Sequence, residues 1–125
     1  NNASRLGLKA LKFLHADSTA LLEKMPHWEG FFDRILLDAP CSGLGTLARN
    51  PDLRWRMSPE KITELMKLQF HLLEGILPAL KSGGRIVYST CTINPDENFR
   101  QVRNFVSLHD ELKLEDETHG VELIN

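Results

Sequence analysis

Cysteine is the residue type in this sequence best suited to covalent chemistry, and it occurs twice, as Cys41 and Cys91. A thiolate is a strong nucleophile, whereas a buried neutral thiol behaves as a small apolar side chain. Cys41 lies in the segment DAPCSG at residues 38–43, and Cys91 lies in the segment YSTCT at residues 88–92. Buried structural cysteines usually lie within a strand, so two cysteines just beyond short apolar runs favour a functional role.

The apolar runs that precede the cysteines predict two buried strands. Residues 32–37, and the residues before Cys91 in the segment 85–92, are rich in branched apolar side chains and are bounded by turn-forming residues, a pattern typical of strands rather than helices. Residues 8–15 partly alternate apolar and polar side chains, which predicts a third strand.

Helices are predicted between these strands. A short helix follows Asp17 or Ser18 as its cap, and a long helix begins at Ser58, with Pro59 in its first turn and an apolar stripe along one face. Asn94 begins a third helix in the same way. Alternating strands and helices predict an α/β fold with a parallel sheet that is covered on both faces.

In such sheets, ligands bind in the crevice outside the carboxyl ends of the strands. Asp17, Asp38, Cys41 and Cys91 all follow predicted strands, so they are the candidate lining of this crevice. If the strands before the two cysteines are neighbours joined by one right-handed crossover, both thiols face one cleft. The alternatives are that Asp17 only caps a helix and that the cysteines are buried apolar groups.

A second candidate region is residues 49–56, which contain Arg49, Arg54, Trp55 and Arg56. Arginine pairs with phosphate, and an exposed indole can stack on a nucleic-acid base. The alternative is an ordinary loop with Trp55 packed on the core. A formal net charge of −2 argues against a globally basic nucleic-acid binder and leaves room for a local basic patch.

Composition excludes several other classes of protein. With 42% hydrophobic and 26% charged residues in 125 positions, the chain is predicted to be one globular unit. No apolar run reaches membrane-spanning length and no secretory leader opens the sequence, so a soluble, cytoplasmic protein with free thiols is expected.

The five histidines have no ligand spacing relative to the cysteines, which argues against a metal site. There is no glycine-rich nucleotide fingerprint, so the loop for a nucleotide-like cofactor would precede Asn1.

Taken together, these motifs resemble the Sun (Nol and Nop) family of RNA 5-methylcytosine methyltransferases, especially its bacterial members that act on small-subunit ribosomal RNA. The resemblance covers about residues 3 to 108, and its motifs are DAPCSG, YSTCT, the segment NPDEN at residues 94–98, the loop at residues 49–55 and the helix around Gln69. It implies the C-terminal part of a Rossmann-like domain that depends on S-adenosylmethionine, with three parallel strands. Its first cofactor-binding strands and its final hairpin are expected to be missing.

The resemblance also implies roles for individual residues. Cys91 corresponds to the nucleophile, Cys41 to a second cysteine that helps to release the product, and Asp38 and Asp17 to residues that line the cofactor and target-base pocket. Related DNA enzymes attack through the cysteine of the Pro-Cys pair, here Cys41, but the STCT motif is the mark of the RNA family and favours Cys91. The implied reaction methylates C5 of a cytosine in RNA, expected to be 16S ribosomal RNA, in a monomeric protein. The RNA-binding residues would be Arg49, Arg54, Trp55 and Arg56.

Two other functions stay open at this point: a noncatalytic RNA-binding or assembly module, and a small-molecule methyltransferase. Residues 1–125 are expected to form one partial catalytic domain, with an acidic edge strand and solvated tail over residues 109–125. Without the cofactor loop, the isolated chain is expected to be inactive and poorly stable.

Overall fold

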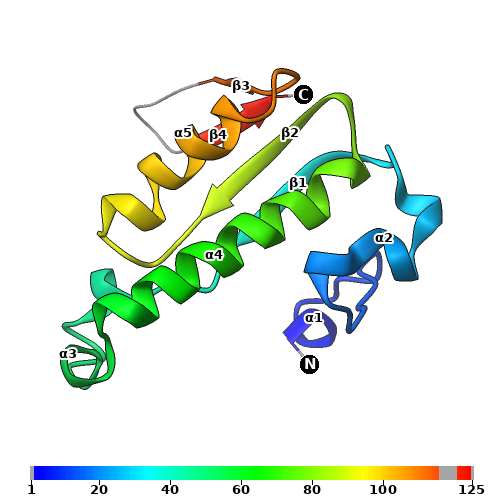
Figure 1. Ribbon diagram of the computed structural model, residues 1–125. Coiled ribbons are helices and arrows are strands. Elements are labelled where there is room, and N and C mark those ends of the chain that lie inside the picture. The colour runs from blue at the N-terminus through cyan, green and yellow to red at the C-terminus, as the bar shows by residue number, and fades with distance from the viewer. Residues whose placement is uncertain (1, 116–120, 125) are drawn as a thin grey trace.

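The computed structural model describes residues 2–115 and 121–124, and its centre is a four-stranded sheet with the order β1-β2-β4-β3 (Figure 1). The strands are β1 (Phe32–Asp38), β2 (Leu80–Ser89), β3 (Lys113–Leu114) and β4 (Val121–Ile124). β1 and β2 are parallel, whereas β4 runs antiparallel to both β2 and β3. The predicted α/β fold with parallel pairing is therefore confirmed. The two antiparallel strands β3 and β4 add to the parallel pair at one side of the sheet.

The helices are α1 (Asn2–Arg5), α2 (Leu21–Lys24), α3 (Leu53–Arg56), α4 (Pro59–Ile76) and α5 (Phe99–Ser107), with short 3₁₀ turns η1 (Ser18–Ala20), η2 (Pro26–Trp28), η3 (Leu44–Thr46), η4 (Leu77–Ala79) and η5 (Pro95–Glu97). α4 begins as the sequence predicts, because the Ser58 side chain accepts a hydrogen bond from the Lys61 backbone N–H at 3.3 Å. No helix in the described ranges is long and apolar enough to cross a membrane.

The core lies on one face of the sheet, where α4 and α5 pack (Figure 1). It contains side chains of β1, β2, α4 and α5, namely Leu37, Ile86, Tyr88, Leu73, Ile76, Leu77, Val102 and Phe105. Leu36 and Val87, which alternate with these residues along β1 and β2, are exposed on the other face. The prediction that both faces of the sheet are covered by helices is therefore wrong for the described residues.

Residues 8–15 form no strand, and this prediction is also wrong. β1 is the end strand of the sheet, so no strand of the described residues lies along its outer edge. A strand exists only through ladder hydrogen bonds to a neighbour, and its alternating apolar side chains need a face on which to pack. Without either, Leu8, Leu11, Phe13 and Leu14 are 49–71% exposed.

The close approach of η1 to α4 depends on Gly75. A Cβ atom at this position would lie 2.2 Å from the Ser18 carbonyl oxygen and 2.7 Å from Thr19 Cα. Both neighbours are backbone atoms, so they cannot move aside as the end of a flexible side chain could.

We therefore predict that Gly75→Ala destabilises the protein by about 1–3 kcal/mol through overpacking. An unhindered glycine-to-alanine change in a helix would instead stabilise it by up to about 1 kcal/mol. The midpoint of thermal unfolding measures the sign, with Glu64→Ala on the exposed side of α4 as the control. A raised midpoint for Gly75→Ala would contradict the packing described.

Candidate active site

Cys41 and Cys91 lie beyond the carboxyl ends of the adjacent parallel strands β1 and β2, where Asp38 is in register with Ser89. Both cysteines are free, and their Sγ atoms are 3.2 Å apart. The Cys91 backbone N–H also donates to Cys41 Sγ at 3.3 Å. The two thiols therefore lie side by side, as the predicted strand order requires, and Cys91 is the more exposed of the two.

Glycine allows the turn after Cys41 to press against Cys91. Gly43 has a φ of 70°, in the left-handed region that glycine adopts without strain. The Gly45 backbone N–H donates to the Cys91 carbonyl oxygen at 3.1 Å, and a Cβ atom on Gly45 would lie 2.8 Å from that oxygen. A side chain at Gly45 would therefore separate the two loops.

The environment of Cys41 favours its protonated form. Burial raises the pKa of the Cys41 thiol above its ordinary value, and the hydrogen bond with Cys91 Sγ raises it further, against opposing backbone N–H groups of Gly43 and Cys91. Cys41 therefore holds its proton at neutral pH and can donate it in the hydrogen bond to Cys91 Sγ.

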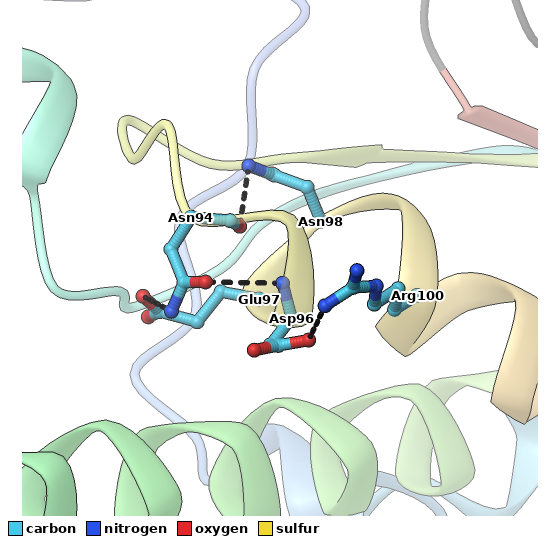
Figure 2. A network of polar contacts seen from close by, with 5 residues as sticks. All are labelled: Asn94, Asp96, Glu97, Asn98 and Arg100. Atoms are coloured by element: carbon cyan, nitrogen blue, oxygen red, sulfur yellow. Dashed lines mark hydrogen bonds and ion pairs between the residues drawn. The ribbon is translucent and has the colours of Figure 1, made fainter.

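A buried carboxylate, Glu97, lies beneath the two cysteine loops. Its side chain accepts hydrogen bonds from Ser42 N (2.8 Å), Ser42 Oγ (2.5 Å), Gln69 Nε2 (3.2 Å) and Asn94 Nδ2 (3.2 Å). Figure 2 shows Glu97 beside Asn94, in the turn that Asn94 begins. Asp96 and Glu97 are adjacent acids in the segment NPDEN, and no local pattern in the sequence shows which of them is buried. Ser42 and Thr92 were likewise missed as hydrogen-bonding partners.

Asp38 and Asp17 have different surroundings. Asp38 is exposed at the end of β1, and no residue of the described ranges donates a hydrogen bond to its side chain. Asp17 caps η1, because its Oδ1 accepts from Thr19 N at 2.9 Å and from Thr19 Oγ1 at 2.7 Å. These bonds hold the pKa of Asp17 below its ordinary value. The cap interpretation is confirmed, and Oδ2 of Asp17 accepts no hydrogen bond from the described residues.

The structure does not bring Asp17 to the cysteine cleft. Cys41 lines a cavity of about 320 Å³ together with Met57, Lys61, Glu64, Leu65 and Leu68, from the first half of α4 and the residues before it. Ser18, next to Asp17, instead lies against Gly75. Gly75 is seven residues beyond Leu68, or about 10 Å along the helix at 1.5 Å per residue. Of the four residues predicted to line one crevice, the structure therefore brings Cys41 and Cys91 into direct contact, and Asp38 lies three residues before Cys41 at the end of β1.

The arginine-rich loop, residues 49–56 including the short helix α3, lies next to the cysteine pair. The Trp55 side chain is 89% exposed, so the alternative that packed it on the core is wrong. Arg49, Arg54 and Arg56 are also exposed, and Arg56 pairs with Asp52 at 3.0 Å. A Cβ atom on Gly43 would lie 3.2 Å from Leu53 Cδ1 and 3.9 Å from Cys91 Sγ, so the first residue of α3 packs close to the cysteine pair.

No group of three or more potential metal ligands occurs among residues 2–115 and 121–124. Near the cysteine pair, the described residues supply two thiols, the Asp38 carboxylate and backbone N–H groups.

We predict that the two thiols differ in their reaction with iodoacetamide. Cys91 should be alkylated first because it is exposed, and Cys41 should react at a pH above the ordinary thiol range of about 8.5 because its raised pKa lowers the thiolate fraction. Mass spectrometry of peptides after short exposures between pH 6 and 10 measures both rates. Protein unfolded in guanidinium is the control, where the difference should vanish. Equal pH profiles in the folded protein would contradict the environment described for Cys41.

Comparison with known proteins gives one consistent family. Residues 1–124 match the family model described as 16S rRNA methyltransferase RsmB/F. The chain is 51% identical over 111 residues to the probable ribosomal RNA small subunit methyltransferase B of Synechocystis sp., covering 89% of the chain and 24% of that protein. It is 46% identical over 104 residues to ribosomal RNA small subunit methyltransferase B of Yersinia enterocolitica, covering 81% of the chain and 24% of that protein. The chain thus spans about a quarter of the length of these curated relatives.

Solved structures are similar over nearly the whole chain. The crystal structure of PH0851 has a TM-score of 0.84 and 33% identity, covering 98% of this chain and 32% of that one. The crystal structure of NSun6 from Pyrococcus horikoshii with SFG has a TM-score of 0.76 and 27% identity, covering 98% of this chain and 35% of that one. Both similarities extend over the sheet and the candidate site.

Proposed function

Since the chain belongs to the 16S rRNA methyltransferase RsmB/F family, we propose that the protein containing it transfers a methyl group from S-adenosylmethionine to C5 of a cytosine in RNA, with 16S ribosomal RNA as the substrate. The observation that carries the proposal is the pair of free thiols 3.2 Å apart at the carboxyl ends of two parallel strands. The reaction would proceed through a covalent bond between a cysteine and C6 of the base.

The reaction needs a nucleophile because C5 of cytosine is too electron-poor to take a methyl group directly. In the proposal, the Cys91 thiolate adds to C6, and the electrons of the C5–C6 double bond make C5 nucleophilic. S-adenosylmethionine supplies the methyl group to C5. Loss of the C5 proton to a base then restores the double bond and expels the Cys91 thiolate. Exposure favours Cys91 for the first step, since a base held in the cleft must reach the sulfur.

Cys41 would act through its proton. Its raised pKa keeps the thiol protonated, and an S–H group 3.2 Å from Cys91 Sγ can donate a hydrogen bond to it. That bond stabilises negative charge on Cys91 both before addition and when the sulfur leaves C6. Cys41 would therefore help to release the product without forming a bond to the base.

The carboxylates fit contacts to polar ligands. Asp38 is exposed beside the cysteines and has no hydrogen-bond donor in the described ranges, so it could accept hydrogen bonds from the edge of the cytosine ring. Oδ2 of Asp17 remains available to the cofactor, although Asp17 lies against the later part of α4 and not next to the cysteines. S-adenosylmethionine is a cation with amino and hydroxyl donors, which suits both carboxylates. The similar structure with SFG, an analogue of S-adenosylmethionine, supports this choice of cofactor.

Binding of RNA would use the arginine-rich loop. A cytosine must leave its stack to reach Cys91, and an exposed aromatic side chain next to the cleft can stack on a neighbouring base. Trp55 meets this requirement, and Arg49, Arg54 and Arg56 present positive charge on the same loop. This exposure favours RNA over a small-molecule substrate.

We predict opposite effects of the two cysteine substitutions in the complete protein. With S-adenosylmethionine and substrate RNA, Cys41→Ala should accumulate a covalent protein–RNA adduct, because release of Cys91 from C6 is slowed. Cys91→Ala should form no adduct and lose methyl transfer by about 10⁴-fold or more. Denaturing electrophoresis and transfer of a labelled methyl group measure the two effects.

The reverse pattern, with adduct in Cys91→Ala and none in Cys41→Ala, would exchange the two roles. Absence of methyl transfer to RNA by the unsubstituted protein would instead support the noncatalytic RNA-binding module.

We also predict that Trp55→Ala weakens RNA binding. Loss of one base–aromatic stack of about 1–3 kcal/mol corresponds to a rise in Kd of roughly 5- to 150-fold. Titration of labelled substrate RNA at fixed salt measures the change, and Leu108→Ala, which truncates an exposed apolar side chain on another surface, is the control. An unchanged Kd for Trp55→Ala would show that the loop does not stack on RNA.

A further inference from the structure

Among residues 5–115, Glu97 is the one fully buried acidic side chain, with 0% of its surface exposed. A buried charge is strongly unfavourable unless hydrogen bonds compensate for the lost water. Here both carboxylate oxygens are compensated: Oε1 accepts from Ser42 N and Gln69 Nε2, and Oε2 accepts from Ser42 Oγ and Asn94 Nδ2. All four partners donate, which suits the ionised form.

The four donors come from three separate parts of the chain. Ser42 follows Cys41, Gln69 lies in the middle of α4, and Asn94 belongs to the loop that follows Cys91. Gln69 Nε2 also donates to the Pro40 carbonyl oxygen at 3.0 Å, so it holds the residue before Cys41 as well. One carboxylate therefore ties the loop of each cysteine to α4.

A directed chain of hydrogen bonds joins the two cysteine loops. The single hydroxyl proton of Ser42 is donated to Glu97 Oε2, so Ser42 Oγ must accept from Thr92 Oγ1, 2.7 Å away. Thr92 Oγ1 in turn accepts from the Asn94 backbone N–H at 3.2 Å. Since Ser42 follows Cys41 and Thr92 follows Cys91, the contact between these hydroxyls lies directly beside the contact between the two sulfurs.

The backbone of Glu97 is held too. Tyr88 Oη, from the end of β2, donates to the Glu97 carbonyl oxygen at 2.9 Å. Burial raises the pKa of Tyr88 far above its ordinary value, with smaller effects from the charges of Glu97 and Cys41, so this donor keeps its proton. The carboxylate is thus fixed relative to the sheet as well as to α4.

From these contacts we propose that Glu97 is a positioning residue for the cysteine pair: it fixes Cys41 and Cys91 in the relative placement that the reaction needs, through Ser42 and Thr92. This inference rests on the proposed function and adds to it a residue with a distinct role. Glu97 touches neither sulfur in the contacts described, so it acts through the loops rather than on the base.

The first test is independent of RNA and cofactor. Diamide takes two electrons and two protons from a pair of thiols to form a disulfide, and its second step is fast only when the sulfurs are held together. In the complete protein, Glu97→Gln should slow formation of the Cys41–Cys91 disulfide by about tenfold or more, because an amide presents donors to Ser42 or Asn94 in place of one acceptor. Mass spectrometry of alkylated peptides measures the rate.

The matched control is Asp96→Asn, which removes a charge of the same sign one residue away. The Asp96 carboxylate pairs with Arg100 at 2.8 Å on the surface of the same turn (Figure 2). Only the backbone N–H of Asp96 contacts Asn94, at 3.1 Å, and this contact does not involve the side chain that is changed. The Asp96→Asn protein should form the disulfide and transfer the methyl group at the same rates as the unsubstituted protein.

The second test uses single-turnover methyl transfer to substrate RNA. Glu97→Gln should lower the rate by about 10²-fold, the usual effect of misplacing reacting groups by about 1 Å, while the Kd for RNA stays within twofold. Ser42→Ala, which removes only the hydroxyl link, should give a smaller defect of the same kind. This variant keeps the inference testable if Glu97→Gln fails to fold.

The outcomes are distinct. Two results would overturn the positioning role. The first is a folded Glu97→Gln protein whose rates of disulfide formation and methyl transfer lie within about threefold of those of the unsubstituted protein. The second, if Glu97→Gln does not fold, is a Ser42→Ala protein that shows no defect in either rate. A Glu97→Gln protein that loses RNA affinity by the same factor as its turnover rate would also overturn the positioning role. An unsubstituted protein that transfers no methyl group refutes the proposed function, and the disulfide measurement then still decides whether Glu97 positions the thiols.

Discussion

The parallel pairing of β1 with β2 sets the positions of the two cysteines. Each strand ends at the same edge of the sheet, and Asp38 is in register with Ser89, so the loops that follow must begin side by side. Fifty residues separate Cys41 from Cys91 in the sequence, yet their sulfurs are 3.2 Å apart. The long crossover through α4 makes this possible because it returns the chain to the start of the next parallel strand.

The apolar core and the polar layer beneath the cysteines have different tasks. Leu73, Ile86 and Phe105 are fully buried and stabilise the packing of α4 and α5 on the sheet. Glu97 and Ser42 are buried as deeply but contribute orientation, because hydrogen bonds have narrow preferences in distance and angle that apolar contacts lack. The hydrogen-bonded layer therefore accounts for the close contact between two loops that have little regular structure.

The environment of the thiols also follows from this placement. Cys41 is partly buried next to Cys91, which raises the pKa of the Cys41 thiol, whereas Cys91 remains exposed to the cleft. Two chemically identical side chains thereby acquire different accessibility and different surroundings. The family assignment identifies the class of reaction, and this difference in environment supports the proposed division of labour between the cysteines.

The sequence by itself determined the features that depend on neighbouring residues. Branched apolar runs specified β1 and β2, Ser58 and Pro59 specified the start of α4, and the motifs around the cysteines placed both at strand ends. Tertiary structure alone decided whether residues 8–15 form a strand, because a strand requires a partner that no local pattern supplies. It also decided that Glu97 is buried and Asp96 is not, since the donors that make burial possible come from Ser42 and Gln69, far away in the sequence. Local periodicity encodes elements, whereas the compensation of a buried charge is a property of the assembled fold.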